Sequence, residues 1–425
     1  MTNPLQTLRG TGRWLRAATF GLTLAAVMLA SGIVAAQSPQ TSYTFKVIYD
    51  FCSLPNCADG STPYAGLIGD AKGVGFGTTY FGGTCSLSDD CGTVFEVTKG
   101  GKETVLYSFM GESDGESPVG GLVRDSEGSL YGTASYGGDL TCNPSFYGCG
   151  TVFKLTAAGQ FTVLHNFTGM PDGLQPLAGL LRDAAGNLYG TTAYGGRGQC
   201  ATTGAGCGTV FKIDSAGNET VLYAFAGGSD GFQPEGGLVM DKEGNLYGTT
   251  FGDGTAAPGT VFKVTPSGQE TVLYTFKNGS DGNAPRGTLI MDAQGNLYGT
   301  TSGGVNGTVF KLSKSGEETV LWDFQGYPDG STPEAGVVMD AAGNLYGTTQ
   351  LGGDINAPNC SFSGGCGTVF EVSKDGVERV LYAFEGGSDG GFPVAPVILD
   401  GKDNLYGTTP DYGYPYGGNV FTLIK

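Results

Sequence analysis

The chain has 425 residues, with 22 lysines and arginines against 40 aspartates and glutamates, so its net charge at pH 7 is −18. This excess of acid excludes a protein that binds nucleic acid or an anionic membrane through a basic surface. The chain has one histidine and ten cysteines, none of them in a Cys-x-x-Cys step, which argues against a cysteine-based metal centre.

The first 36 residues have the three-part layout of a secretory signal peptide. Three arginines precede an apolar run over residues 17–34, and Val34-Ala35-Ala36 stands before Gln37. We expect cleavage after Ala36, a short leader over residues 37–42, and export to the periplasm or beyond the cell. The alternative is an uncleaved anchor, because the run approaches the ~20 residues that span a bilayer. No other stretch is long and apolar enough for a span.

The rest of the chain, residues 43–425, consists of seven copies of one unit. Each copy contains an Asp-Gly pair, a proline four residues after that aspartate, a Leu-Tyr-Gly-Thr-Thr-like segment and a Gly-Thr-Val-Phe segment. The Asp-Gly pairs begin at Asp59, Asp114, Asp172, Asp230, Asp281, Asp329 and Asp389, and the last segments begin at Gly92, Gly150, Gly208, Gly259, Gly307, Gly367 and, as Gly-Asn-Val-Phe, Gly418. The length varies only between Thr-Thr and Gly-Thr-Val-Phe.

Each unit contains four short β-type runs separated by turn residues. In the second unit we expect strand A over residues 121–124, B over 129–134, C over 150–155 and D over 161–167. Strands C and D are apolar on both faces, so each sheet must be covered on both sides. Radially stacked blades provide that cover. We therefore predict an all-β fold, a seven-bladed β-propeller with four antiparallel strands per blade.

The two ends of the repeat region are complementary. The first element, residues 45–51, matches a strand D, whereas the chain ends on a strand C at residues 420–424. We expect the N-terminal run to serve as the outer strand of the C-terminal blade, which would leave no unpaired strand at the seam. Residues 43–425 are thus predicted to be one closed domain.

The ten cysteines lie in five close pairs, and in an exported chain this spacing predicts five local disulfides. In four of the pairs the second cysteine directly precedes a Gly-Thr-Val-Phe glycine, so each bridge would close the preceding B–C loop at its exit. The remaining pair would staple the seam. The pairs are Cys52/Cys57, Cys85/Cys91, Cys142/Cys149, Cys200/Cys207 and Cys360/Cys366.

The unit, for instance residues 236–250 followed by Gly-Thr-Val-Phe-Lys-Val from Gly259, resembles the bacterial GloVer repeat of the "choice-of-anchor tandem repeat" proteins. It is more loosely similar to NHL-type and streptogramin-lyase propellers. The resemblance covers nearly all of residues 43–425 and implies a secreted or surface-displayed protein. It assigns no catalytic residue.

In an antiparallel blade the B–C loop and the D–A link lie at the same end, so the variable, cysteine-bearing segments should share one face. Rigid scaffolds usually carry recognition on such loops. The alternative is neutral drift at a tolerant surface, because loops accept insertions at little thermodynamic cost. We predict a secreted binding module, a monomer, that contacts an extracellular polysaccharide or protein through this face.

Aromatic residues are frequent in these loops, and flat rings beside hydrogen-bonding acids suit sugar rings. We therefore predict ligand contacts, with carbohydrate as the hypothesis, at Tyr80, Phe81, Tyr136, Phe146, Tyr147, Tyr194, Phe362, Tyr412, Tyr414 and Tyr416.

Other functions have weaker support in the sequence. An extracellular carbohydrate-active hydrolase or lyase is the second interpretation and a structural envelope protein the third, but the repeated acids single out no catalytic pair. The only histidine, His165, replaces a tyrosine that other units carry in strand D, so we interpret it as an outer-strand packing residue. We expect no cofactor or metal. A ring of the seven Asp-Gly aspartates holding Ca²⁺ is the alternative to a repeated turn.

Overall fold

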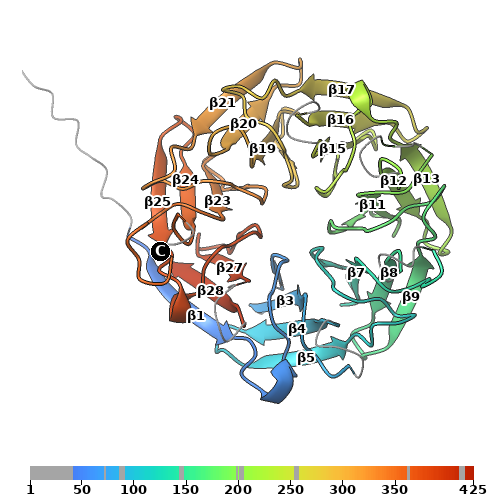
Figure 1. Ribbon diagram of the computed structural model, residues 1–425, viewed down its shortest axis with the longest axis horizontal. Helices are drawn as coiled ribbons and strands as arrows, with labels where there is room; N and C mark the ends of the chain where they lie inside the picture. Colours follow the sequence, from blue (N-terminus) through green and yellow to red (C-terminus); the bar gives the residue numbers. More distant parts are fainter. Residues whose placement is uncertain are drawn as a thin grey trace, which may run out of the picture. The chain divides into compact units, whose positions relative to one another are not determined.

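A computed structural model describes residues 42–70, 73–85, 91–142, 148–197, 200, 205–252, 258–360, 364–410 and 417–425. Seven four-stranded antiparallel sheets form a ring, as predicted (Figure 1). The predicted signal peptide and most of the leader lie outside the described residues. Within the part described, no helix is both long and apolar enough to cross a membrane.

Each blade runs from strand A at the axis to strand D at the perimeter, and blades are numbered from the N-terminal side. The A strands, in blades 1 to 7, are β2 (Ile68–Gly69), β6 (Val123–Arg124), β10 (Leu181–Arg182), β14 (Val239–Met240), β18 (Ile290–Met291), β22 (Val338–Met339) and β26 (Ile398–Leu399). The B strands are β3 (Val74–Thr79), β7 (Leu130–Ala134), β11 (Leu188–Thr192), β15 (Leu246–Thr250), β19 (Leu297–Thr301), β23 (Leu345–Thr349) and β27 (Leu405–Thr409).

The C strands are β4 (Thr93–Thr98), β8 (Thr151–Leu155), β12 (Thr209–Ile213), β16 (Thr260–Val264), β20 (Thr308–Leu312), β24 (Thr368–Val372) and β28 (Asn419–Ile424). The D strands are β5 (Glu103–Ser108), β9 (Phe161–Asn166), β13 (Glu219–Ala224), β17 (Glu270–Thr275), β21 (Glu318–Asp323), β25 (Glu378–Ala383) and β1 (Thr44–Asp50). Three 3₁₀ turns, η1 (Pro55–Cys57), η2 (Gly228–Asp230) and η3 (Gly387–Asp389), lie in D–A links. The A strands are shorter than expected, with two paired residues each.

The threonines of the repeat hold the blades together near the axis. In blade 3, the hydroxyl of Thr192 lies 2.8 Å from that of Thr209, which joins strand B to strand C. The preceding Thr191 donates a hydrogen bond to the carbonyl of Gly236, which lies just before strand A of the next blade, at 3.1 Å. The same contact between blades is made by Thr133, Thr300, Thr348 and Thr408. One threonine of the pair therefore serves its own blade and the other links neighbouring blades.

The hydrophobic core lies between adjacent blades. A typical cluster combines Val261 and Phe276 of blade 4 with Leu289, Leu297 and Phe310 of blade 5, all of them buried. The phenylalanine of each Gly-Thr-Val-Phe segment packs over the glycine of Leu-Tyr-Gly. In blade 3, a Cβ at Gly190 would lie 2.6 Å from the Phe211 ring, so this close approach requires glycine.

The A–B hairpins have the turn chemistry that Asp-x-x-Gly-Asn predicts. In blade 4, the Asp241 carboxylate accepts hydrogen bonds from the backbone of Asn245 at 2.8 Å, its side-chain amide at 2.7 Å and the Tyr247 hydroxyl at 2.8 Å. Burial raises the pKa of Asp241, but these hydrogen bonds outweigh it and the net pKa is lowered. The motif is thereby explained as a turn.

The seam closes as predicted. β1 pairs antiparallel with β28 from Thr44↔Ile424 to Asp50↔Asn419, so the first strand of the chain completes the last blade. In Figure 1 the blue β1 lies against the red β28. All ten cysteines form the five expected disulfides, and the Cys52–Cys57 bridge directly follows β1.

The burial of the cysteines adds to what the sequence predicts. The four loop bridges form as predicted, and the second cysteine of each is a core residue. These four are at most 1% exposed: Cys91, Cys149, Cys207 and Cys366. They pack in the hydrophobic clusters between blades. The reason is their position, because each directly precedes the glycine that leads into a strand C whose first three residues are buried.

The first cysteines of these bridges differ in exposure. Cys200 and Cys360 are buried as well, whereas Cys85 and Cys142 are partly exposed. Each bridge therefore ties its loop to the core of the ring, and the buried sulfurs of the second cysteines are not part of a ligand-binding surface.

Blade 1 departs from the repeat at one core position. The leucine that begins strand B in the other six blades, Leu188 in blade 3 for example, is replaced by Gly75. A cavity of about 690 Å³ lies at this place between blades 7 and 1, and Leu67, Gly75 and Val97 are among its lining residues. A Cβ at Gly75 would meet only ordinary contacts at 3.5 Å or more.

We expect Gly75→Leu to raise the free energy of unfolding by about 1–2 kcal/mol, because it buries a leucine where space exists. The reverse change, Leu188→Gly, should lower it by about 3–5 kcal/mol, since it opens a cavity in a packed core. Urea unfolding of both variants checks the pair. A destabilised Gly75→Leu variant would show that the space is not a packing defect.

Candidate functional site

The D–A links and B–C loops meet at one face of the ring. In several blades, an isolated β-bridge joins the D–A link that enters the blade to the B–C loop of the same blade. Examples are Ser61 with Phe81 and Leu174 with Tyr194. Each link also bonds to the loop of the preceding blade, as where the Gln175 amide donates to the Cys149 carbonyl at 3.0 Å. The variable loops are therefore anchored to the constant links, and this face is distinct from that of the tight hairpins.

The residue before each constant proline has a left-handed backbone conformation. Its φ lies between 53° and 57° at Thr62, Ser117, Gln175, Gln233, Ala284, Thr332 and Phe392. None of these residues is glycine, so the conformation is strained. In all seven cases the amide donates to a carbonyl of the preceding blade's B–C loop, which compensates for part of the strain. This bend directs the chain through the proline toward the axis.

The buried cysteines supply four of those seven carbonyls. Besides Cys149, the acceptors are Cys91 for Ser117 at 3.1 Å, Cys207 for Gln233 at 3.0 Å and Cys366 for Phe392 at 2.7 Å. The other three acceptors are the carbonyls of Gly417, Pro258 and Asn306, so the bend forms with or without a disulfide beside it.

The residues after the prolines surround the mouth of a central cavity. The cavity has a volume of about 550 Å³, within the range of small-molecule sites. Its walls are the glycine-rich residues that directly precede the A strands, because neighbouring backbones approach closely there. The residues that follow the prolines are Tyr64, Val119, Leu177, Glu235, Arg286, Glu334 and Val394, and all seven line the cavity.

Three successive blades contribute a charged network to this mouth. The Arg286 guanidinium of blade 5 lies between two carboxylates, 3.3 Å from Glu235 of blade 4 and 2.9 Å from Glu334 of blade 6. It also covers the ring of Phe251, 4.1 Å from the centroid. The three charged side chains are 18–34% exposed, so they are held in place and still reach solvent.

The electrostatics follow from this partial burial. Burial raises the pKa of Glu235, and Arg286 offsets only part of that effect. Burial alone would lower the pKa of Arg286, but the two carboxylates raise it, so the guanidinium stays charged. The network has two acids and one base, and it disfavours an anionic ligand.

Aromatic and amide side chains flank the network. The Gln233 amide donates to the Tyr194 hydroxyl at 2.6 Å, and both Glu235 and Arg286 lie close enough to influence the pKa of Tyr194. On another side of the mouth, the Tyr64 and Tyr80 rings meet edge to face, with centroids 5.2 Å apart.

Four of the predicted loop residues lie beside the mouth, but none of them is among the residues that line the central cavity. Tyr80 contacts Tyr64, which lines the cavity, and Tyr194 accepts a hydrogen bond from Gln233. Phe81 packs against Tyr80 with centroids 4.3 Å apart, and Tyr136 lies near Tyr194. The other predicted contacts fall outside the described residues: Phe146, Tyr147, Phe362, Tyr412, Tyr414 and Tyr416.

Glu235, Arg286 and Glu334 were not predicted from the sequence. They occupy the position after the constant proline, which holds tyrosine, valine, leucine or a charged residue in different units. The sequence offered one signal, which is that this position varies inside a segment of constant length. Three successive units have a charged residue there. These residues predict a cluster only if the seven-bladed ring is already assumed, because the ring places equivalent positions of neighbouring blades side by side.

The Asp-Gly aspartates do not lie at the axial mouth but near the perimeter. We call the place where each aspartate meets strand D of the preceding blade an outer junction. At six junctions the aspartate accepts a hydrogen bond from a strand-D side chain of the preceding blade, and the donors are Tyr49, Tyr107, Tyr223, Tyr274, Trp322 and Tyr382. At the seventh junction, His165 Nε2 lies 3.1 Å from Asp172 Oδ2, and the tautomer of the imidazole decides which role Nε2 has. His165 therefore has a polar partner, Asp172, besides its edge-to-face contact with Phe167.

Comparison with known proteins agrees with the repeat architecture. A family model described as the Gloeobacter/Verrucomicrobia repeat matches residues 17–204 and again residues 200–421. None of the curated proteins matches this sequence. A solved structure from Lactobacillus plantarum is 15% identical, covers 79% of this chain and 89% of its own, and gives a TM-score of 0.50. A luciferin-regenerating enzyme is 12% identical over 90% of this chain and 96% of its own, with a TM-score of 0.43. At these identities the likeness concerns the fold alone.

Proposed function

Because the chain belongs to the Gloeobacter/Verrucomicrobia repeat family, whose units here build a closed seven-bladed ring, we propose that it is an exported carbohydrate-binding propeller. Its ligand is a neutral sugar chain that binds at the axial mouth, on the face of the B–C loops. The observation that carries this proposal is the Glu235–Arg286–Glu334 network across three blades.

The chemistry of the mouth supports a sugar ligand. Neighbouring sugar hydroxyls act as both donors and acceptors, and carboxylate and guanidinium groups pair with them in fixed geometry. Tyr64 and Tyr80 supply aromatic surface beside the polar groups. The excess of carboxylate over guanidinium favours a neutral chain over an acidic one.

Export is supported by the five disulfides, which persist in oxidising compartments. The disulfides indicate an extracellular or periplasmic protein. Secretion through cleavage after Ala36 is the finer proposal, and the mass of the mature protein from its natural host tests it.

Binding is tested by titrating cellohexaose, mannohexaose and xylohexaose, with polygalacturonate as the acidic competitor. We expect Glu334→Gln to weaken binding of the preferred neutral sugar at least tenfold, or about 1.4 kcal/mol. This variant removes one carboxylate charge, while Glu235 remains paired with Arg286, so the fold should persist. Calorimetry or a glycan array measures the effect.

The control is Lys242→Met, an exposed residue on an A–B hairpin of the opposite face. It should bind as the parent protein does. Equal affinity of the Glu334→Gln variant and the parent, or a preference for polygalacturonate, would contradict the proposed site.

A hydrolase is the second candidate, because the raised pKa of Glu235 is a property of general acids. Release of reducing ends from the bound oligosaccharide distinguishes it from a binding protein. Within the binding proposal, the sugar is recovered intact.

A further inference from the structure

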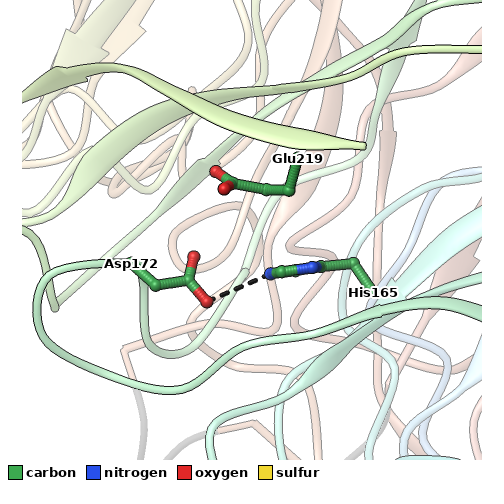
Figure 2. Close-up of side chains that lie close together, drawn as sticks. All are labelled: His165, Asp172 and Glu219. Atoms are coloured by element: carbon green, nitrogen blue, oxygen red, sulfur yellow. Dashed lines mark hydrogen bonds and ion pairs between the residues drawn. The ribbon is translucent and has the colours of Figure 1, made fainter. Parts of the chain in front are cut away.

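The outer junction between blades 2 and 3 differs from the other six. It contains the only histidine of the chain, at a position where the others have tyrosine or tryptophan. Figure 2 shows the His165 imidazole and the carboxylates of Asp172 and Glu219 converging. One ligand atom from each of the three residues lies within 4.8 Å of the others.

We propose that this junction binds a divalent transition-metal ion, of the Zn²⁺ class, through His165 Nε2 and one oxygen each of Asp172 and Glu219. One imidazole and two carboxylates form a ligand set of the kind that Zn²⁺ and similar ions accept. In a tetrahedral site, ligand atoms about 2.1 Å from one ion are ~3.4 Å apart. The three atoms lie within 4.8 Å of one another, so the most distant pair needs to draw together by up to ~1.4 Å.

Two unsatisfied oxygen atoms provide an independent observation. Asp172 Oδ1 and Glu219 Oε1 are buried and have no hydrogen-bond partner in the described part of the protein. The equivalent glutamate oxygen is also unpartnered at four other junctions, in Glu103, Glu270, Glu318 and Glu378, so Asp172 Oδ1 is the atom that distinguishes this junction. Buried acceptors without donors are unfavourable. A cation between them would satisfy both atoms and offset the repulsion between two adjacent carboxylates.

The other junctions lack at least one element of this set. Tyrosine and tryptophan donate a hydrogen to the aspartate, whereas a neutral imidazole offers a lone pair to a metal. In two junctions the glutamate is also absent: Phe161 stacks on Tyr107, and Phe45 on Tyr382, with centroids 3.9 and 4.0 Å apart. Among the described residues, His, Asp and Glu therefore meet at one junction.

The junction also has space for further ligands. A cavity of about 460 Å³ adjoins it, lined by Asp172 and Glu219 together with Arg197 and Tyr223. Three protein ligands leave a fourth position of a zinc ion open, and water in this cavity can occupy it. The site lies near the perimeter, so it is independent of sugar binding at the axis.

The experiment is calorimetric titration of untagged, chelator-treated protein with ZnCl₂, followed by Co²⁺ absorption spectroscopy. We expect one equivalent of metal to bind and Tm to rise. In the matched variant, His165→Tyr, the junction gains the residue that five other junctions have, so it should fold with an unchanged Tm and bind no metal. Glu219→Gln should weaken binding at least tenfold.

A gain of binding provides the converse test. Tyr223→His places a histidine beside Asp230 and Glu270 at the next junction, and a second equivalent should then bind. A stoichiometry that stays at one would count against histidine as the deciding ligand. Absence of Zn²⁺ binding by the parent at 1 mM, or undiminished binding by His165→Tyr, would overturn the proposal.

Discussion

Deletion of residues 42–50 is expected to unfold blade 7 and to destabilise the whole ring by roughly 5 kcal/mol or more. These residues contain β1, the outer strand that joins the two ends of the chain through its pairing with β28. Phe45 stacks on Tyr382 of blade 6, with ring centroids 4.0 Å apart, and contacts Phe421 of blade 7. Each large apolar side chain buried contributes about 1.5–3 kcal/mol, and a domain has only about 5–15 kcal/mol in total.

The control for this deletion is a circular permutant. Residues 42–50 are moved to follow Lys425 through a C–D hairpin copied from residues 265–268. Blade 7 then has the same connectivity as the other six, so we expect a Tm close to that of the parent in thermal unfolding. A deletion that leaves Tm unchanged, or a permutant that fails to fold, would show that closure through β1 is not what stabilises the ring.

Stability should decline between pH 5 and pH 8, because carboxylates at the outer junctions are destabilised when they ionise. Burial, reinforced by Asp59 and Glu96, raises the pKa of Glu103 to about 7. Burial and an Asp-Gly aspartate likewise raise the pKa of Glu270 to about 7 and that of Glu378 to about 8.

The sign follows from linkage. A pKa raised above its unfolded value near 4.5 contributes stability that is complete below that value and is lost as pH rises through 7 to 8. These side chains are only about half buried, so solvent screening reduces the effect, and we expect a loss of about 1–3 kcal/mol in sum. Below pH 4 stability should also fall, because the hairpin aspartates, such as Asp241, have a lowered pKa.

Replacement of Glu103, Glu270 and Glu378 by glutamine should flatten the profile of Tm between pH 5 and pH 8. The matched control replaces three exposed glutamates, Glu127, Glu243 and Glu317, and so changes net charge equally. It should retain the parent's slope. If Tm depended on pH with equal slope in the two triple variants, the pH dependence would not arise from the three junction glutamates.

The architecture was predictable because each repeated residue has the same role in every blade. The count of Gly-Thr-Val-Phe segments gave the seven blades, and the strand-D pattern of residues 45–51 gave the closure. The disulfides followed from spacing alone, since each pair is separated by no more than seven positions.

The burial of the second cysteines did not follow from spacing. Cys91, Cys207 and Cys366 end segments of variable length, which is typical of surface loops, yet the structure places them in the core. Their adjacency to the buried start of strand C was visible in the sequence and is the signal that indicates their position.

The sites were less predictable because they join residues that are far apart in the chain. Glu235 and Glu334 meet through Arg286 only because the ring aligns equivalent positions of successive blades. The left-handed residue before each proline was also unexpected, since a residue before proline usually prefers an extended backbone. By contrast, the constant separation of seven residues between strand-D donor and aspartate, as from Tyr107 to Asp114, was visible in the sequence and indicates their contact.

The proposed ligand recognition at the axial mouth is tested most directly by hydrogen–deuterium exchange. The protein saturated with its preferred hexaose is compared with the free protein. We predict that protection concentrates in residues 233–237, 284–288 and 332–336, where blades 4 to 6 reach the mouth. Protection confined to the A–B hairpins of the opposite face, with these three segments unchanged, would contradict it.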